Sequence, residues 1–453
     1  LILSTVAIQS LTHTGMFKRA QEAKDKMENA KKDEQIILGQ YIDELNKQTQ
    51  NEKYDKTKGV NKPELMQGMK AVKFTEPKGD TEGTVEQITD STSTAWYDYN
   101  AKKWANAQTQ DGSMWVWIPR FAYKVNSSTK TFDVVFLKDT TNTYLDNGTE
   151  KDAEKEGYIV HPAFKNESST GYENGGWDKE LTGIWVSKFE AGYATSNGNS
   201  APKKASSVNY SQTSVWASGY ETGGQDGSLP ARNWIDGVYG NTKTSIKYPT
   251  FQGLAYSMNY TNHNDAFNIS KALTESGNIY GLNSSSTDSH LMKNSEWGAV
   301  SYLSQSKYGL DGTNIVINSV YLNNTTKSVY AVTGCTGATE DASSVATTIT
   351  ELNKRTTLGV YVWTQKSGTK ASTTGTIYGI YDMSGGTWER TAGLVNNGNA
   401  NLATYGQSLL NALNNGKSSK YVTVYPHDSS VDKTGANIDT ASTAIAMITM
   451  GFA

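Results

Sequence analysis

The first part of the chain has a helical pattern of small apolar residues. Residues 1–8 are mostly apolar, and charged residues follow from Lys18 onward. Apolar positions then recur at steps of three and four, and no Pro occurs before Pro63, so the pattern predicts one continuous helix face. Its positions are Ala20, Ala23, Met27, Ala30, Ile37 and Tyr41, with Glu34 as the one polar interruption. This narrow, Ala-rich stripe suits close approach between helices rather than cover for a large core.

Farther along, the pattern changes to short runs with alternating aromatic residues. The run MWVWIPRFAYKV predicts a strand with one buried aromatic face, in which Pro119 lies at an edge or ends the pairing. The run GIWVSKFEAGY predicts a second strand. Helical patterns are scarce, at residues 251–260 and 290–309 only, and Gly, Asn, Ser and Thr fill the remainder. The large domain is therefore predicted to be α+β, with short strands, two modest helices and long loops.

The length of 453 residues allows two or three domains. We expect an N-terminal helix over residues 1–50, a connector with short strands over 51–111, and a head over 112–453. With 41 Gly, 26 Tyr and 11 Trp, the composition is typical of β-rich secreted and cell-surface domains. The formal net charge of −3 provides no basic surface for nucleic acid.

The single cysteine, Cys335, excludes an intrachain disulfide and a multi-cysteine metal site. Its neighbours are small and uncharged, which favours an inert or buried thiol over a reactive one. The five histidines are scattered without an HExxH pairing, which argues against a zinc enzyme. They are His13, His161, His263, His290 and His427.

Residues 1 to about 46, including GMFKRAQEAKDKMENA, resemble the N-terminal helix of type IV pilin-like proteins of clostridia-type bacteria. The mostly apolar residues 1–8 are too few to span a bilayer, which takes about 20, so we expect the sequence to begin inside a longer apolar segment. The resemblance implies a segment that sits in the membrane before assembly and then packs against identical copies in a filament. The implied polymerisation residues are Leu1, Ile2, Leu3, Val6, Ile8, Ala20, Ala23, Met27 and Ala30.

Two motifs in the head resemble the formylglycine-generating-enzyme superfamily, which has a C-type-lectin-like fold. HLMKNSEWGAVSYLSQSKYG matches its helix motif through Glu296 and Trp297, and YGIYDMSGGTWERTAG matches its GLYDMxGNVWEW signature. The resemblance implies a fold-signature core of Glu296, Trp297, Tyr381, Asp382 and Trp388, with both tryptophans buried.

The same resemblance bears on chemistry and cofactors. The family's copper chemistry uses two cysteines after the second motif, whereas Cys335 precedes that motif, so no catalytic residues are predicted. The family's structural calcium site uses an Asn and a Glu of the second motif; Gly386 stands at the Asn position and Glu389 is retained. Calcium at Glu389 is thus possible and no other cofactor is expected. Alternatively, Asp382 and Glu389 hydrogen-bond backbone amides in tight turns.

These features predict a structural subunit of an extracellular type IV pilus-like filament. Its partners would be copies of itself, the membrane before assembly, and a glycan or cell-surface ligand bound by loops at 308–375 and after Gly393. Two alternatives stay open: a membrane-anchored adhesin or receptor that does not polymerise, and a metal-dependent enzyme of the superfamily. The N-x-S/T triplets at Asn259, Asn268 and Asn324 are weak indications of glycosylation, because chance matches are expected in so polar a chain.

Overall fold

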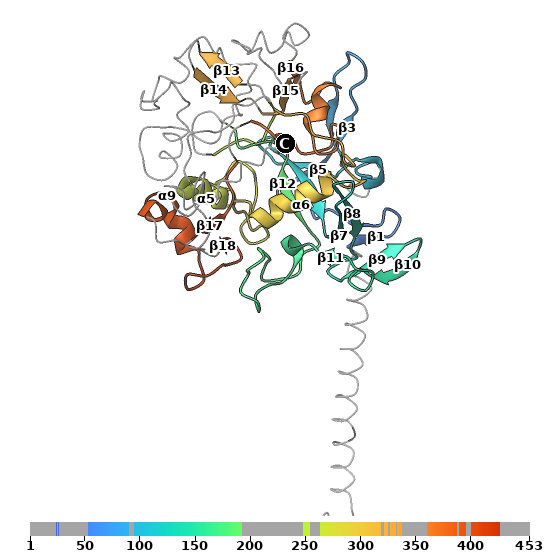
Figure 1. Ribbon diagram of the computed structural model, residues 1–453, viewed down its shortest axis with the longest axis vertical. Helices are drawn as coiled ribbons and strands as arrows, with labels where there is room; N and C mark the ends of the chain where they lie inside the picture. The colour runs from blue at the N-terminus through green and yellow to red at the C-terminus, as the bar shows by residue number, and fades with distance from the viewer. Residues whose placement is uncertain are drawn as a thin grey trace, which may run out of the picture. The chain divides into compact units, whose positions relative to one another are not determined.

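In the computed structural model the chain divides into two compact units, Leu1–Lys53 and Tyr54–Ala453 (Figure 1). The structure describes residues 24, 26, 53–89, 95–192, 248–253, 263–318, 321–324, 327–331, 333–337, 360–386, 389–395 and 400–425. The architecture below is therefore that of the second unit.

A five-stranded antiparallel sheet forms the centre of this unit, in the order β12-β6-β5-β3-β4. Its strands are β3 (Lys70–Thr75), β4 (Thr84–Gln87), β5 (Asn106–Gln108), β6 (Met114–Pro119) and β12 (Gly183–Ser187). Strands β3, β4 and β5 lie in the segment expected to be a connector, so that segment supplies three of the five strands of the sheet. Helix α6 (Asn294–Ser304) contacts strand β8 (Thr131–Phe136) of a second sheet.

Strand β6, between β12 and β5, is buried along its whole length because both faces of the sheet are covered here. All six of its residues are buried. Trp115 packs in one apolar cluster, whereas Val116, Trp117 and Ile118 pack in the main core with α6. The prediction of a single buried face was thus too narrow, and of the two roles predicted for Pro119 the strand end is confirmed, since β6 stops there.

A second antiparallel sheet has the order β11-β7-β8, and the other strands form pairs. Its members are β7 (Phe121–Asn126), β8 (Thr131–Phe136) and β11 (Ile159–Val160). The pairs are β1 (Tyr54–Asp55) with β2 (Val60–Asn61), β9 (Thr143–Asp146) with β10 (Thr149–Asp152), β13 (Tyr321–Asn324) with β14 (Lys327–Ala331), β15 (Cys335–Gly337) with β16 (Val360–Val362), and the parallel β17 (Gly393–Val395) with β18 (Thr423–Tyr425).

The α-helices among the described residues are short. They are α5 (His263–Ala272), α6 (Asn294–Ser304) and α9 (Ala400–Asn411). Helix α6 confirms the helix predicted over 290–309, whereas residues 251–253 of the other predicted helix are not helical. None of the described helices is long and apolar enough to span a bilayer.

The predicted fold class is therefore wrong. Among the described residues the structure is mainly small antiparallel sheets with three short helices, and the residues of the expected N-terminal helix, apart from Lys24 and Lys26, lie outside the described ranges. Short polar strands carry little periodic signal, so the sheet content of the second unit was underestimated from the sequence.

The main core is aromatic, and its polar ring atoms bond to backbone carbonyls. Trp96 Nε1 donates to Asn106 O at 2.7 Å, and Trp104 Nε1 donates to Tyr308 O at 2.9 Å. Tyr99 OH donates to Trp117 O at 2.7 Å. Burying each such ring stabilises the fold by roughly 2–3 kcal/mol provided that its polar atom keeps a partner.

Candidate functional site

Helix α6 holds the first of the two sequence motifs. Glu296, in its first turn, accepts the backbone N–H of Lys293 at 2.8 Å through Oε2, which satisfies one of the free donors at the helix start. Trp297 lies in the main core, as predicted, and its indole N–H donates to Glu389 Oε2 at 2.6 Å. That bond joins the first motif to the second.

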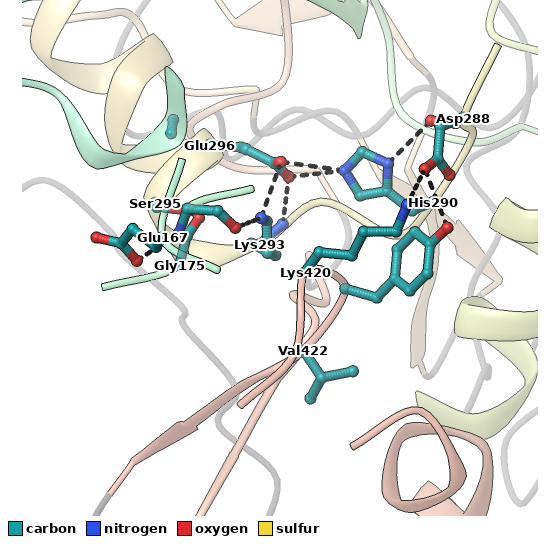
Figure 2. A network of polar contacts seen from close by, with 12 residues as sticks. Glu167, Gly175, Asp288, His290, Lys293, Ser295, Glu296, Lys420 and Val422 are labelled. Carbon is teal, nitrogen blue, oxygen red and sulfur yellow. Dashed lines mark hydrogen bonds and ion pairs between the residues drawn. The ribbon is translucent and has the colours of Figure 1, made fainter. Parts of the chain in front are cut away.

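Two basic side chains surround the buried carboxylate of Glu296 (Figure 2). His290 Nε2 lies 3.1 and 3.0 Å from its two oxygens, and Lys293 Nζ lies 3.6 Å from Oε1. Burial alone would raise the pKa of Glu296, but the charges of His290 and Lys293 outweigh it and lower that pKa to about 2. The fully buried Lys293 also donates to Gly176 O at 2.8 Å and lies 4.2 Å from the ring centre of Trp177.

The network continues outward from His290 to the segment before β18. His290 Nδ1 lies 3.2 Å from the backbone oxygen of Asp288. The Asp288 carboxylate accepts Lys420 Nζ at 3.1 Å and the Tyr421 hydroxyl at 3.0 Å, and Lys420 also pairs with Asp178 at 3.1 Å. These contacts connect three segments that are far apart in the sequence.

A loop that precedes β12 is bound to the same helix. Glu167 accepts the backbone N–H groups of Asn174 at 3.1 Å and Gly176 at 2.9 Å, so its carboxylate holds the loop closed. Ser295 Oγ, on the first turn of α6, donates to Gly175 O at 2.7 Å (Figure 2). All these charged and polar groups are engaged in holding segments together, so the cluster acts as a structural junction.

The second motif forms a tight turn around a buried carboxylate. Asp382 has a left-handed backbone, with φ +67°, and is 1% exposed. Its Oδ1 accepts Asn318 Nδ2 at 2.6 Å, and its Oδ2 accepts the Gly334 N–H at 3.0 Å. Burial raises the pKa of Asp382 to about 6, although these hydrogen bonds oppose the shift. Asp382 thus accepts a hydrogen bond from a backbone amide, which is the alternative to a calcium site that the sequence left open.

Gly386 and Glu389 show how the calcium position of the related family is built here. Gly386 has φ +72°, and a Cβ added to it would lie 2.6 Å from Glu190 Oε1. The Glu190 carboxylate therefore occupies the space into which an Asn side chain would extend. Burial raises the pKa of Glu389 to about 7, and the Trp297 indole N–H opposes that shift.

These residues do not fit a calcium site. Both oxygens of Asp382 and one oxygen of Glu389 accept from N–H donors, which a cation would have to displace, whereas calcium takes six to eight oxygen ligands. No cluster of three or more His, Cys, Asp or Glu side chains placed to hold a metal occurs within the described ranges.

The remaining predicted residues are placed as follows. Tyr381 is buried, and its hydroxyl donates to Trp363 O at 3.0 Å. Cys335 is buried in β15. Trp388 and the polymerisation residues (Leu1, Ile2, Leu3, Val6, Ile8, Ala20, Ala23, Met27 and Ala30) lie outside the described residues, as do parts of both stretches expected to bind a ligand.

Sequence reasoning missed two buried basic side chains that directly follow strands of the central sheet. Arg120 is 1% exposed; it donates to Phe164 O at 2.7 Å and to Thr141 O at 3.0 Å, and it pairs with Glu180. Lys188 is fully buried. Arg120 lies in the aromatic run WIPRFAY and Lys188 in the aromatic run WVSKFEA. A single basic residue inside such a run could have indicated a buried basic side chain.

Comparisons with protein-family models, with curated proteins and with solved structures gave no match to this chain.

Proposed function

We propose that this chain is a structural subunit of an extracellular filament of the type IV pilus kind, with the β-rich unit displayed on the outside. The observation that carries the proposal is the use of the charged motif residues. Glu296 holds the start of α6, Asp382 holds Asn318 and Gly334, and Glu389 holds Trp297. Carboxylates of an active site need open positions toward a substrate, whereas these carboxylates join segments of the fold.

In this proposal the first unit mediates self-association. Its apolar start and its small side chains at Ala20, Ala23, Met27 and Ala30 would lie against other copies of the chain. A head surface rich in Gly, Asn, Ser and Thr suits display in water, and its loops would contact a glycan or another cell-surface ligand.

The test is electron microscopy of material sheared from the producing cells, with mass spectrometry for this chain. Thin filaments with this chain as the main component support the proposal. Recovery of the chain only in membranes, or only as monomers, contradicts it and favours an anchored receptor.

A matched pair of variants sharpens the test. Ala23→Glu places a charge on the small-residue stripe and should abolish filaments. Lys26→Gln changes an exposed side chain nearby and should leave them intact. If both variants form filaments equally well, the stripe does not mediate assembly.

A further inference from the structure

The central sheet encloses a lysine next to an asparagine. Across the sheet Asn106, Val116 and Val186 are in register, and Lys188 follows Val186 by two residues, so Lys188 and Asn106 lie on the same face. Both are fully buried, and the Lys188 Nζ lies 4.8 Å from the ring centre of Phe74 and 5.4 Å from that of Tyr381.

The Lys188 amine has three oxygen neighbours. Its Nζ lies 2.7 Å from Ile377 O, 2.7 Å from Gly379 O and 3.0 Å from Asn106 Oδ1. Burial holds the pKa of Lys188 well below its usual value, with the charge of Glu76 opposing the shift, so its amine loses a proton more readily than that of an exposed lysine. All three oxygens accept from Nζ, and the bond to Asn106 Oδ1 places the amine beside the carboxamide carbon that carries this oxygen.

The carboxamide of Asn106 is itself fixed in place. Its Nδ2 donates to Trp104 O at 2.9 Å and to Tyr378 O at 2.8 Å. Glu76 follows strand β3, close enough to affect the charge of Lys188, and partial desolvation raises the pKa of its carboxyl. The amine and the carboxamide are thus held in contact, and Glu76 is near enough to act on the charge of the amine. Reactants held in place in this way can have effective concentrations of up to about 10⁸ M.

We propose that Lys188 and Asn106 form an intramolecular isopeptide bond. The Nζ lone pair attacks Asn106 Cγ, a Cγ–Nζ bond forms and the Cγ–Nδ2 bond breaks. Glu76 takes a proton from Nζ and delivers one to Nδ2, which leaves as ammonia. No oxidant or other co-reactant is needed, because one amide replaces another.

The bond would connect β5 to the end of β12 across the intervening β6. A chain with one cysteine has no intrachain disulfide to crosslink its fold. The proposed amide would supply a covalent crosslink instead, and thiol reductants would not cleave it. The inference concerns the β-rich unit alone and does not depend on the filament proposal.

Tryptic mapping of the full-length protein tests it directly. Trypsin cleaves after free lysines but not after an acylated one, so the crosslinked protein should give one branched peptide that joins residues 104–120 to residues 180–203. The intact mass should be about 17 Da below the sequence mass, the mass of one ammonia. An unshifted mass with separate peptides ending at Arg120 and Lys188 overturns the proposal, and Lys188 is then a buried ammonium held by three oxygens.

Variants give the controls. Lys188→Met and Asn106→Ala should both lose the branched peptide, and Glu76→Gln should leave most of the protein uncrosslinked. Asn147→Ala removes an exposed Asn-Gly turn in which succinimide formation would also release ammonia, and it should keep the branched peptide. The peptide map and intact mass of the wild-type protein decide whether the bond exists. A variant that fails to fold therefore leaves that result unchanged.

Discussion

Replacement of Glu389 by Gln should change how stability depends on pH. In the folded protein the pKa of Glu389 is raised to about 7, from 4.5. A carboxyl whose pKa is raised by folding contributes stability that is fully present below pH 4.5 and is lost as the pH rises through 7. Glutamine keeps an oxygen for the Trp297 indole N–H and removes the charge.

The magnitude follows from the size of the shift. One pKa unit corresponds to about 1.4 kcal/mol, so a rise from 4.5 to about 7 sets an upper limit of roughly 3 kcal/mol. The side chain is only half-buried, and solvent screening reduces this to about 1–3 kcal/mol. Glu389→Gln should therefore gain about this much free energy of unfolding, relative to wild type, between pH 5 and pH 8.

The assay is urea denaturation followed by tryptophan fluorescence at pH 5, 6, 7 and 8, with wild type, Glu389→Gln and Glu275→Gln compared. Glu275 is exposed and controls for the loss of one surface charge. Parallel curves for wild type and Glu389→Gln across this range would refute the reasoning, because a carboxyl whose pKa is raised to about 7 by folding must change the stability difference between pH 5 and pH 8.

Three other expectations concern the same two motifs. Glu296→Gln should lower the free energy of unfolding by about 2–3 kcal/mol at pH 6, in the same denaturation assay. The loss should shrink as the pH falls from 4.5 to 2, because the ionised Glu296 carboxylate stabilises the fold fully above pH 4.5 and becomes protonated over that range. Gly386→Ala should destabilise the fold by roughly 1–3 kcal/mol more than Gly79→Ala and should have the lower melting temperature of the two variants. Both glycines have a positive φ, but only at Gly386 would the added methyl group collide with a side chain, that of Glu190. Millimolar calcium should shift the melting temperature by less than about 1 °C, whereas a site filled at 100 times its Kd would add about 2.7 kcal/mol; a larger shift contradicts the fit described for Glu389.

The elements that the sequence predicted correctly are those with a complete local signal. Strands β6 and β12 were predicted from alternating aromatic residues, and α6 from apolar positions at helical spacing. The place of β3, β4 and β5 in the central sheet was not predicted, because short polar strands carry no information about which strand they pair with. The N-terminal helix expected over residues 1–50 stays a prediction, because nearly all of that segment lies outside the described residues.

In the candidate site too, residues with a local sequence signal were identified, whereas contacts that depend on strand pairing were missed. The motifs identified Glu296, Trp297 and Asp382, whose bonding partners are partly local or in the other motif. Lys188 and Asn106 were missed because their contact depends on sheet register and on residues near 378, and register is not visible in the spacing of two side chains.

The bonds of Tyr378 reach back to the beginning of the β-rich unit. Its hydroxyl donates to Phe74 O at 3.0 Å, and its own backbone oxygen accepts Asn106 Nδ2. The first strands of the central sheet therefore stay incomplete until a segment about 300 residues later has arrived. A domain with such a high contact order folds slowly, since the entropy of closing a long loop is lost before native contacts compensate for it. Chains that end before Tyr378 should consequently expose a half-finished aromatic core and aggregate, so this unit is a poor candidate for folding while it is still being synthesised.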